Sequence, residues 1–198
     1  MQQKTFLDET TIIEESFRLG VEIYRSNFKP SFIVGLWRGG STIGIYIQEC
    51  LQTLGIQTDH IAIRTSYAGE HEYRKMLESD KPDIRVHGTQ YLLETLNAHD
   101  QLLIVDDVFS SGLNMQAVLT KLRRRLKRNL PEQIRIACLY RKPEMTRVEF
   151  EPDYFLHETN DWLVLPYELV GLNDQELAQH KPALQQIKAS TPYPPTAT

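Results

Sequence analysis

The sequence LLIVDDVFSSG, residues 102–112, decides the fold class. Its four leading aliphatic residues predict a strand buried on both faces, as in a parallel sheet. Asp106 and Asp107 follow where that strand is predicted to end, and open α/β sheets bind ligands beyond their strand ends. The Ser-Ser-Gly turn then supplies hydroxyls and unhindered N–H groups at the start of a helix, which suits a phosphate. Together these features predict a site for a phosphorylated sugar, in which the acids accept hydrogen bonds from hydroxyls or hold Mg²⁺ through water. For the two acids alone, the plainer alternative is a solvated loop.

Strand and helix patterns alternate along the rest of the chain. Strands are predicted at residues 32–37, 60–64, 102–105 and 134–140, with one or two short strands between 154 and 165; helices are predicted at about 8–27, 41–54 and 113–128. This alternation predicts an α/β fold with a doubly wound, mostly parallel sheet. We expect a single domain over residues 1–189, since 198 residues suffice for one full core.

Two stretches stand outside this pattern. Residues 190–198 are rich in Pro and Thr, and we expect a disordered tail there. Residues from about 65 to 88 are polar and charged, and a connection of that length inside a domain is usually functional or mobile.

Composition and charge exclude several classes of protein. A net charge of -4 argues against a nucleic-acid surface, and no apolar run approaches the roughly 20 residues that span a bilayer. The basic cluster at residues 121–128 predicts a solvated helix face, with a phosphate or acidic-partner patch as the alternative. The N-terminus does not have a signal-peptide core, and Cys50 and Cys138 lie in apolar runs. We therefore expect a cytoplasmic protein with reduced thiols.

A second loop suits a diphosphate. The stretch GLWRGGST, residues 35–42, follows a predicted strand and opens a helix. It is not a nucleoside triphosphatase loop, because Ser41 stands where that motif requires Lys. Gly39 and Gly40 allow the backbone to approach a ligand closely, and Arg38 adds a bidentate charge. Taken alone, the stretch fits a strand-to-helix turn with an exposed Arg equally well.

These motifs, in this order, resemble a known family. Residues 102–112 resemble the phosphoribosyl-diphosphate-binding motif of type I phosphoribosyltransferases. Residues 35–42 resemble the pyrophosphate loop of the purine enzymes, in which the peptide before the basic residue, here Trp37–Arg38, can be cis. The stretch RTSYAG, residues 64–69, resembles the start of the mobile active-site loop of the hypoxanthine-guanine branch and makes Ser66 and Tyr67 candidate substrate contacts. The resemblance spans roughly residues 30 to 170 and is to the hypoxanthine/xanthine-guanine phosphoribosyltransferase family.

The resemblance also implies a base pocket in a small hood region. The stretches around Lys142 and from Asp161 to Glu168 are similar to the base-binding segments of the 6-oxopurine enzymes. By this resemblance Lys142 donates to the 6-oxo group, Trp162 stacks on the purine, and backbone near Leu163 reads the ring edge. Glu168 falls where the family has an acid that helps with Mg²⁺ or the 2-position. The chemistry is consistent, because a cation selects a carbonyl acceptor and rejects the amino group of adenine.

The implied reaction transfers 5-phosphoribose from its Mg²⁺-bound 1-diphosphate to a 6-oxopurine and releases pyrophosphate. Asp106 and Asp107 bind the ribose hydroxyls, Asp107 also reaches Mg²⁺, and Arg38 with its glycines holds the leaving diphosphate. The 5-phosphate site and the residues flanking it comprise Val108, Phe109, Ser110, Ser111, Gly112 and Asn114. The expected assembly is a homodimer or homotetramer.

Two positions depart from the family pattern. Asn114 stands where Thr or Ser is usual, although its amide can still donate to a phosphate. Ser110 stands where many members carry an Asp proposed to handle the proton on purine N7, and a neutral hydroxyl is a poor base at neutral pH. Two alternatives to the 6-oxopurine enzyme therefore stay open. One is an enzyme that acts on another base, and the other is a regulator that senses the donor without turnover.

Overall fold

The computed structural model describes residues 4–67 and 84–191, and the chain divides into two compact units. The larger unit is Thr10–Asn160, and the smaller one joins Met1–Glu9 to Asp161–Thr198. Ser190, where the predicted tail begins, is the last residue of a helix, and residues 192–198 lie outside the described part. In the described ranges, no helix is both long and apolar enough to cross a membrane.

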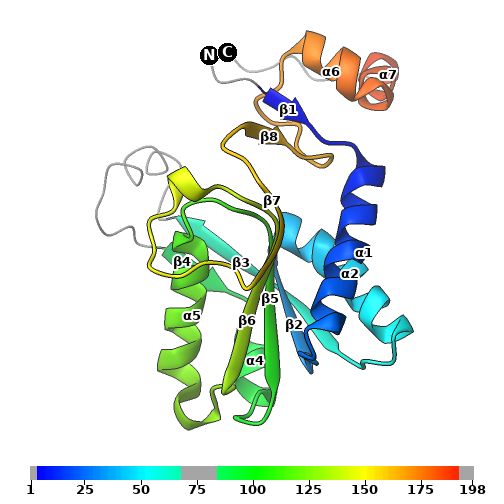
Figure 1. Cartoon of the computed structure of the whole chain (residues 1–198). Coiled ribbons are helices and arrows are strands. Elements are labelled where there is room, and N and C mark those ends of the chain that lie inside the picture. Colours follow the sequence, from blue (N-terminus) through cyan, green and yellow to red (C-terminus); the bar gives the residue numbers. More distant parts are fainter. Residues whose placement is uncertain (1–3, 68–83, 192–198) are drawn as a thin grey trace. The chain divides into compact units, whose positions relative to one another are not determined.

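The larger unit is built on a six-stranded sheet with the order β4-β3-β2-β5-β6-β7 (Figure 1). Its strands are β2 (Phe32–Trp37), β3 (Asp59–Tyr67), β4 (Ile84–His87), β5 (Gln101–Phe109), β6 (Gln133–Arg141) and β7 (Tyr154–Glu158). Only the pair β3–β4 is antiparallel. The predicted mostly parallel α/β fold is confirmed.

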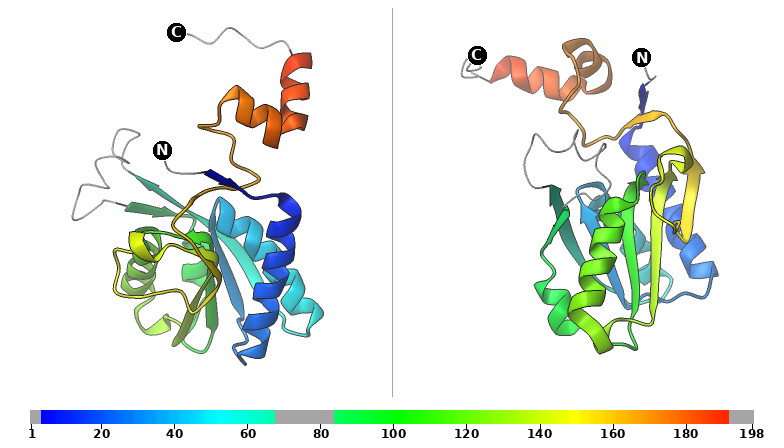
Figure 2. Two further views of the ribbon diagram at one scale, coloured as in Figure 1. Left: turned by 45° about the horizontal axis from the view of Figure 1, so that its top comes forward. Right: turned by 90° about the vertical axis from the view of Figure 1, so that its left-hand side faces the viewer.

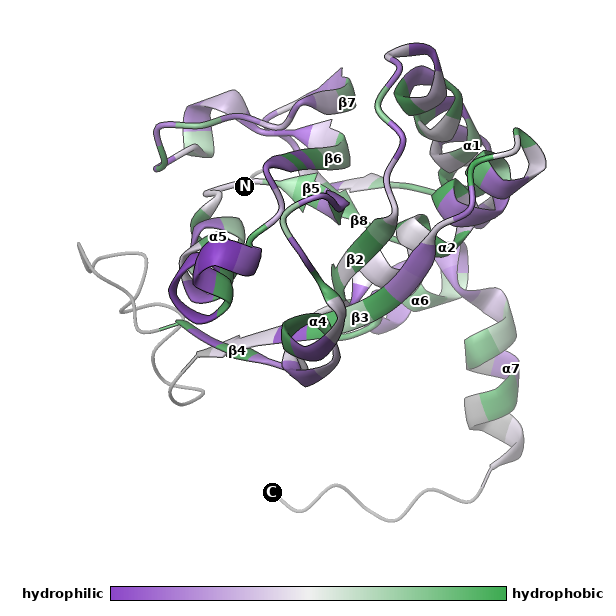
Figure 3. Cartoon of the chain, turned by 90° about the horizontal axis from the view of Figure 1, so that it is seen from below, coloured by the Kyte–Doolittle hydropathy of each residue, from purple (hydrophilic) through white to green (hydrophobic). Residues whose placement is uncertain are grey.

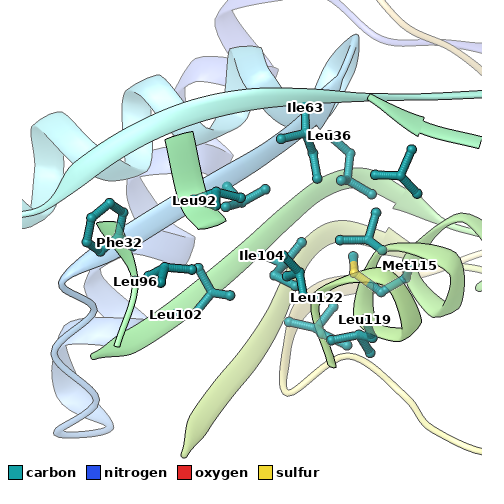
Figure 4. Packing of buried hydrophobic residues seen from close by; sticks show 14 of the residues in the cluster. Phe32, Leu36, Ile63, Leu92, Leu96, Leu102, Ile104, Met115, Leu119 and Leu122 are labelled. Atoms are coloured by element: carbon teal, nitrogen blue, oxygen red, sulfur yellow. The ribbon is translucent and has the colours of Figure 1, made fainter. Parts of the chain in front are cut away.

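The main core lies between the sheet and the helices α4 (Gln90–Thr95) and α5 (Leu113–Leu126). Figure 4 shows strand residues such as Leu36, Ile63 and Ile104 packed against Met115 and Leu122 of α5. The helix is amphipathic: its inner side chains are buried, while hydrophilic residues colour much of its outer surface (Figure 3). Two short 3₁₀ helices follow α5 and β6, at Lys127–Asn129 and Pro143–Met145.

The opposite face of the sheet is covered by α2 (Gly39–Thr53), on which α1 (Glu9–Arg25) packs. Gly20 of α1 allows this packing, because a Cβ there would lie only 3.0 Å from Cβ and Sγ of Cys50. The helix α2 ends at Thr53, and Gly55 just beyond it has a φ of 88°, the left-handed conformation typical of the residue that follows a helix.

The smaller unit contains a two-stranded parallel sheet and two helices. Strand β1 (Lys4–Phe6) pairs with β8 (Trp162–Val164), and α6 (Asp174–His180) and α7 (Pro182–Ser190) follow as the orange and red helices of Figure 2. The Lys4 ammonium lies 2.8 Å from the Glu176 carboxylate and so ties β1 to α6.

Two sequence predictions about element boundaries were wrong. Strand β5 does not end before the acids: it continues through Phe109, because its pairing with β6 extends to the register Phe109–Arg141. The predicted polar connection is also partly strand, since Thr65–Tyr67 pairs with Ile84–Val86 in the β3–β4 ladder. Residues 68–83, the interior of that connection, lie outside the described residues.

Candidate active site

The candidate site lies at the carboxyl ends of three neighbouring parallel strands. β2, β5 and β6 are adjacent in the sheet, so the residues at their carboxyl ends meet at one edge. This edge brings together Arg38, the acid pair of β5 and Lys142. The contact between β5 and Lys142 is direct, since the Lys142 N–H donates to the Phe109 carbonyl at 2.9 Å.

The predicted diphosphate loop packs directly on the strand that carries the acids. A Cβ at Gly40 would stand 2.2 Å from the Val105 carbonyl oxygen and 2.8 Å from Asp106 Cα. No side chain fits in that space, so the loop can take this position only with glycine. The peptide bond Trp37–Arg38 is cis, as the family resemblance suggested.

The two carboxyl groups accept hydrogen bonds from the backbone that follows them. Asp106 accepts the Asp107 N–H at 3.0 Å, and Asp107 accepts the Val108 N–H at 2.8 Å. Burial and the neighbouring Asp107 charge raise the pKa of Asp106 well above its ordinary value. Asp106 therefore keeps its proton more readily than an ordinary carboxyl group does.

The acid pair also fits the Mg²⁺ that the family resemblance implies. Mg²⁺ usually binds one or two carboxylates together with substrate phosphates and keeps several waters. Residues 4–67 and 84–191 contain no group of three or more His, Cys, Asp or Glu that could hold a metal. Two neighbouring carboxylates are a donor set that suits an ion which arrives with a phosphorylated substrate. Glu168, the second predicted Mg²⁺ residue, lies in the smaller unit.

Residues 110–112 form the predicted phosphate turn, which leads into the N-terminus of α5. Gly112 has φ of 74°, and a Cβ there would lie 2.4 Å from Val148 Cγ2, so glycine is required for both reasons. The Ser110 carbonyl accepts from Thr146 Oγ1 at 3.4 Å, and the Ser111 carbonyl accepts from the Arg147 N–H at 3.0 Å. These two hydrogen bonds fix the backbone of the turn directly before the N-terminus of α5, where unpaired N–H groups favour an anion.

The described side-chain contact of Ser110 is with a thioether. Its Oγ donates to Met145 Sδ at 3.5 Å. A thioether is only a weak acceptor and does not take a proton. The position therefore supplies a hydroxyl to the site and no general base.

Three predicted base-binding residues lie in the smaller unit. Trp162 is 55% exposed at the start of β8, and Leu163 beside it is buried. The Glu168 carboxylate accepts the Leu165 N–H at 3.1 Å, which fixes a turn within this unit. The structure describes this unit by itself, so contacts of these residues with a base stay a prediction.

Sequence reasoning missed Arg64 as a site residue. A cavity of about 360 Å³ is lined by Trp37, Arg38, Arg64 and Thr65. The cause is the register of β2 and β3, which sets Trp37 directly opposite Arg64. The quoted stretch RTSYAG contained this arginine, but only the order of the strands shows that it faces the diphosphate loop. Farther along β3, Ser66 pairs with Arg85 of β4, and Tyr67 ends the strand.

Comparison with known proteins identifies the family of the chain. A family model described as phosphoribosyl transferase domain matches residues 2–170. A search of curated proteins gave no match.

Three solved structures share the fold. A purine phosphoribosyltransferase from Pyrococcus horikoshii is 24% identical with a TM-score of 0.63, and the match covers 86% of this chain and 97% of the other. A hypothetical protein from Neisseria gonorrhoeae with bound ppGpp is 16% identical with a TM-score of 0.69, covering 92% and 98%. A xanthine-guanine-hypoxanthine phosphoribosyltransferase from Helicobacter pylori is 18% identical with a TM-score of 0.63, covering 94% and 99%. At these identities the three structures show only a common fold. The family model, in contrast, matches residues 2–170, most of the sequence, and the chain therefore belongs to the phosphoribosyl transferase family of transferase enzymes.

Proposed function

We propose that the protein moves 5-phosphoribose from 5-phosphoribosyl 1-diphosphate to a 6-oxopurine and releases pyrophosphate. The products would be nucleoside monophosphates of hypoxanthine, guanine or xanthine, which is a purine salvage reaction. The observation that supports the proposal is the contact between Gly40 and the backbone at Asp106, because it brings the loop that would hold a diphosphate beside the two acids that would bind ribose.

The donor would lie along the carboxyl edge of β2 and β5. Arg38, with Arg64 across the cavity, would hold the leaving diphosphate, and residues 110–114 would hold the 5-phosphate at the N-terminus of α5. The transition state carries positive charge at the anomeric carbon of ribose. The Asp107 carboxylate would stabilise that charge while both acids accept hydrogen bonds from the ribose hydroxyls. Bound Mg²⁺ would neutralise part of the charge on the departing diphosphate.

Lys142 is the residue that would select a 6-oxopurine. It begins the segment directly after β6, and its backbone is bonded to Phe109 of the acid-bearing strand. An ammonium accepts no hydrogen bond, so it favours a carbonyl and disfavours the amino group of adenine. The names of the Pyrococcus and Helicobacter structures, a purine and a xanthine-guanine-hypoxanthine enzyme, support a purine as the acceptor.

The N7 proton would leave the purine without help from Ser110. The hydroxyl of this residue donates to Met145 Sδ, a thioether that does not take up a proton. Water would then take the proton after the glycosidic bond has begun to form.

A turnover assay with the donor, Mg²⁺ and hypoxanthine, guanine, xanthine or adenine tests the proposal. We expect pyrophosphate release with at least one 6-oxopurine and none above background with adenine. The matched control is Asp107→Asn protein, which should lose activity on every base. Turnover with adenine alone would contradict the proposed base specificity. Donor binding without turnover on any base would instead favour a regulator that senses the donor.

A further inference from the structure

Two arginines and a histidine on β3 and β4 lie in register with Trp37, the last residue of β2 before the diphosphate loop. Trp37 of β2 is opposite Arg64 of β3, and Arg64 is in turn opposite His87 of β4. Two residues farther along the β3–β4 ladder, Ser66 is opposite Arg85. We call these five residues the polar row.

The polar row points away from the hydrophobic core. Ile63 and Val86, at alternate positions of the same two strands, are buried in the core that faces α5. Side chains alternate between the faces of a strand, so Arg64, Arg85 and His87 project to the opposite face, and all three are exposed. A hydrogen bond of 2.8 Å between Ser66 Oγ and His87 Nε2 shows that β3 and β4 present these side chains on one side.

The row has positive charge that the described protein does not neutralise. Within residues 4–67 and 84–191, neither Arg64 nor Arg85 makes an ion pair with a carboxylate, and the same holds for His87. From Trp37 on β2 to His87 on β4, the row crosses two strand spacings, which is about 10 Å. Arg64 is its inner cation and also lines the cavity with Arg38. The anion-binding surface therefore continues from the diphosphate loop onto β4.

We propose that the polar row binds a phosphate chain longer than a diphosphate, such as free tripolyphosphate or the triphosphate of a nucleotide. Arg38 and Arg64 hold the first two phosphate groups, and Arg85 with His87 and the Ser66 hydroxyl holds the next. The inference rests on the proposed function in one respect, namely that the cavity beside Arg38 binds a diphosphate. A ligand of this class competes with the sugar donor, because both occupy the cavity between Arg38 and Arg64.

Calorimetric binding of pyrophosphate and tripolyphosphate, each in excess Mg²⁺, tests this site without reference to turnover. We expect wild-type protein to bind tripolyphosphate at least about tenfold more tightly, the factor that one added charge-assisted hydrogen bond typically supplies. In Arg85→Ala that preference should vanish while pyrophosphate affinity stays the same. Arg123→Ala is the matched control: it removes one exposed arginine from the last turn of α5 and should keep the preference. Arg85→Lys, which keeps the charge, should retain most of it.

The possible results separate the two proposals. Equal affinity for both anions in wild-type protein overturns the polar row and leaves the diphosphate site intact. Failure to bind pyrophosphate at all counts against the proposed function itself. A titration with GTP distinguishes the source of the phosphate chain: affinity equal to that of tripolyphosphate means the chain alone is recognised. GTP could instead bind more tightly than tripolyphosphate. If Trp37→Ala then lowers the affinity for GTP to the tripolyphosphate value, the nucleotide base contacts the exposed indole as well. GTP binding no tighter than pyrophosphate would exclude nucleoside triphosphates.

Discussion

Gly40 and Asp106 lie in backbone contact, although they stand 66 positions apart in the sequence. A Cβ on Gly40 would approach Asp106 Cα to 2.8 Å, so the loop that we assign to the diphosphate and the acids that we assign to ribose hold each other in position. The distance between the diphosphate loop and the acids thus depends on glycine at position 40, which has no side chain.

Gly40→Ala should therefore disrupt the donor site. The methyl group overlaps the Val105 carbonyl, so the loop must shift; overpacking of this kind typically destabilises a protein by about 1–3 kcal/mol. A displacement of about 1 Å in a positioned site can lower the rate roughly a hundredfold. Urea unfolding and donor KM measure the two effects. Ile45→Ala, on the exposed side of the same helix, is the control and should leave donor KM unchanged.

Asp107→Asn should keep the shape of the site and lower kcat by roughly a hundredfold. The substitution removes the carboxylate that faces a cationic transition state, and preorganised charge of this kind contributes about 3 kcal/mol. Steady-state kinetics with saturating donor provide the measurement. An unchanged kcat in purified, folded variant would remove Asp107 from the proposed mechanism.

Asp106→Asn should stabilise the fold increasingly as the pH rises. The folded-state pKa of Asp106 is raised, so the native state holds this proton more tightly than the unfolded chain does. The stability that Asp106 contributes is complete below its unfolded pKa of about 3.9 and is lost as the pH rises through the folded pKa. The gain in unfolding free energy of the variant over wild type should thus be larger at neutral pH than at mildly acidic pH. A constant difference between the two conditions would mean that Asp106 titrates normally.

Lys142→Ala should weaken the use of 6-oxopurines by about 1–3 kcal/mol, the loss expected for a charged hydrogen bond. The backbone N–H of residue 142 still donates to Phe109 in the variant, so the acid-bearing strand should keep its position. We expect a higher KM for the base and nearly unchanged donor binding. If donor binding collapses while the KM for the base holds, Lys142 belongs to the donor site instead.

Ser110→Asp tests the departure from the family. The new carboxylate would lie on the turn that follows the acid pair and would face the phosphate of the donor. Like charges should weaken donor binding, and we expect no faster chemical step in single-turnover kinetics. An acceleration in the range of about 10²–10⁴-fold, typical of a general base, would show that Ser110 limits catalysis in the wild type.

The central strands could be predicted from the sequence, while the short outer elements could not. The predicted strand at residues 32–37 coincides with β2, because a continuous apolar run is a strong local signal. Strand β4 has four residues within a long polar stretch, and its ladder with β3 is a non-local property. The apolar run ends at Val105 and so predicts the strand end there, yet pairing with β6 extends β5 through both acids to Phe109.

The site shows the same division between local and non-local information. Arg38, Asp106 and Asp107 could be predicted because each stands in a contiguous motif whose chemistry is local. Arg64 could not be, since its importance comes from the register that places it opposite Trp37. The Gly40 contact likewise depends on strand order, although the two glycines of the loop had indicated a close approach.

The turn at residues 109–112 is hydrogen-bonded along its length to the segment that follows β6. Lys142 and Arg147 donate to it through their backbone, Thr146 donates through its hydroxyl, and the Ser110 hydroxyl donates back to Met145. Fixing the backbone of one residue costs about 1–2 kcal/mol of conformational entropy, so four residues ordered during folding spare an arriving phosphate roughly 4–8 kcal/mol. The backbone of the turn loses this conformational entropy when the chain folds and not when the ligand binds. A small anion can therefore bind there without organising its own receptor.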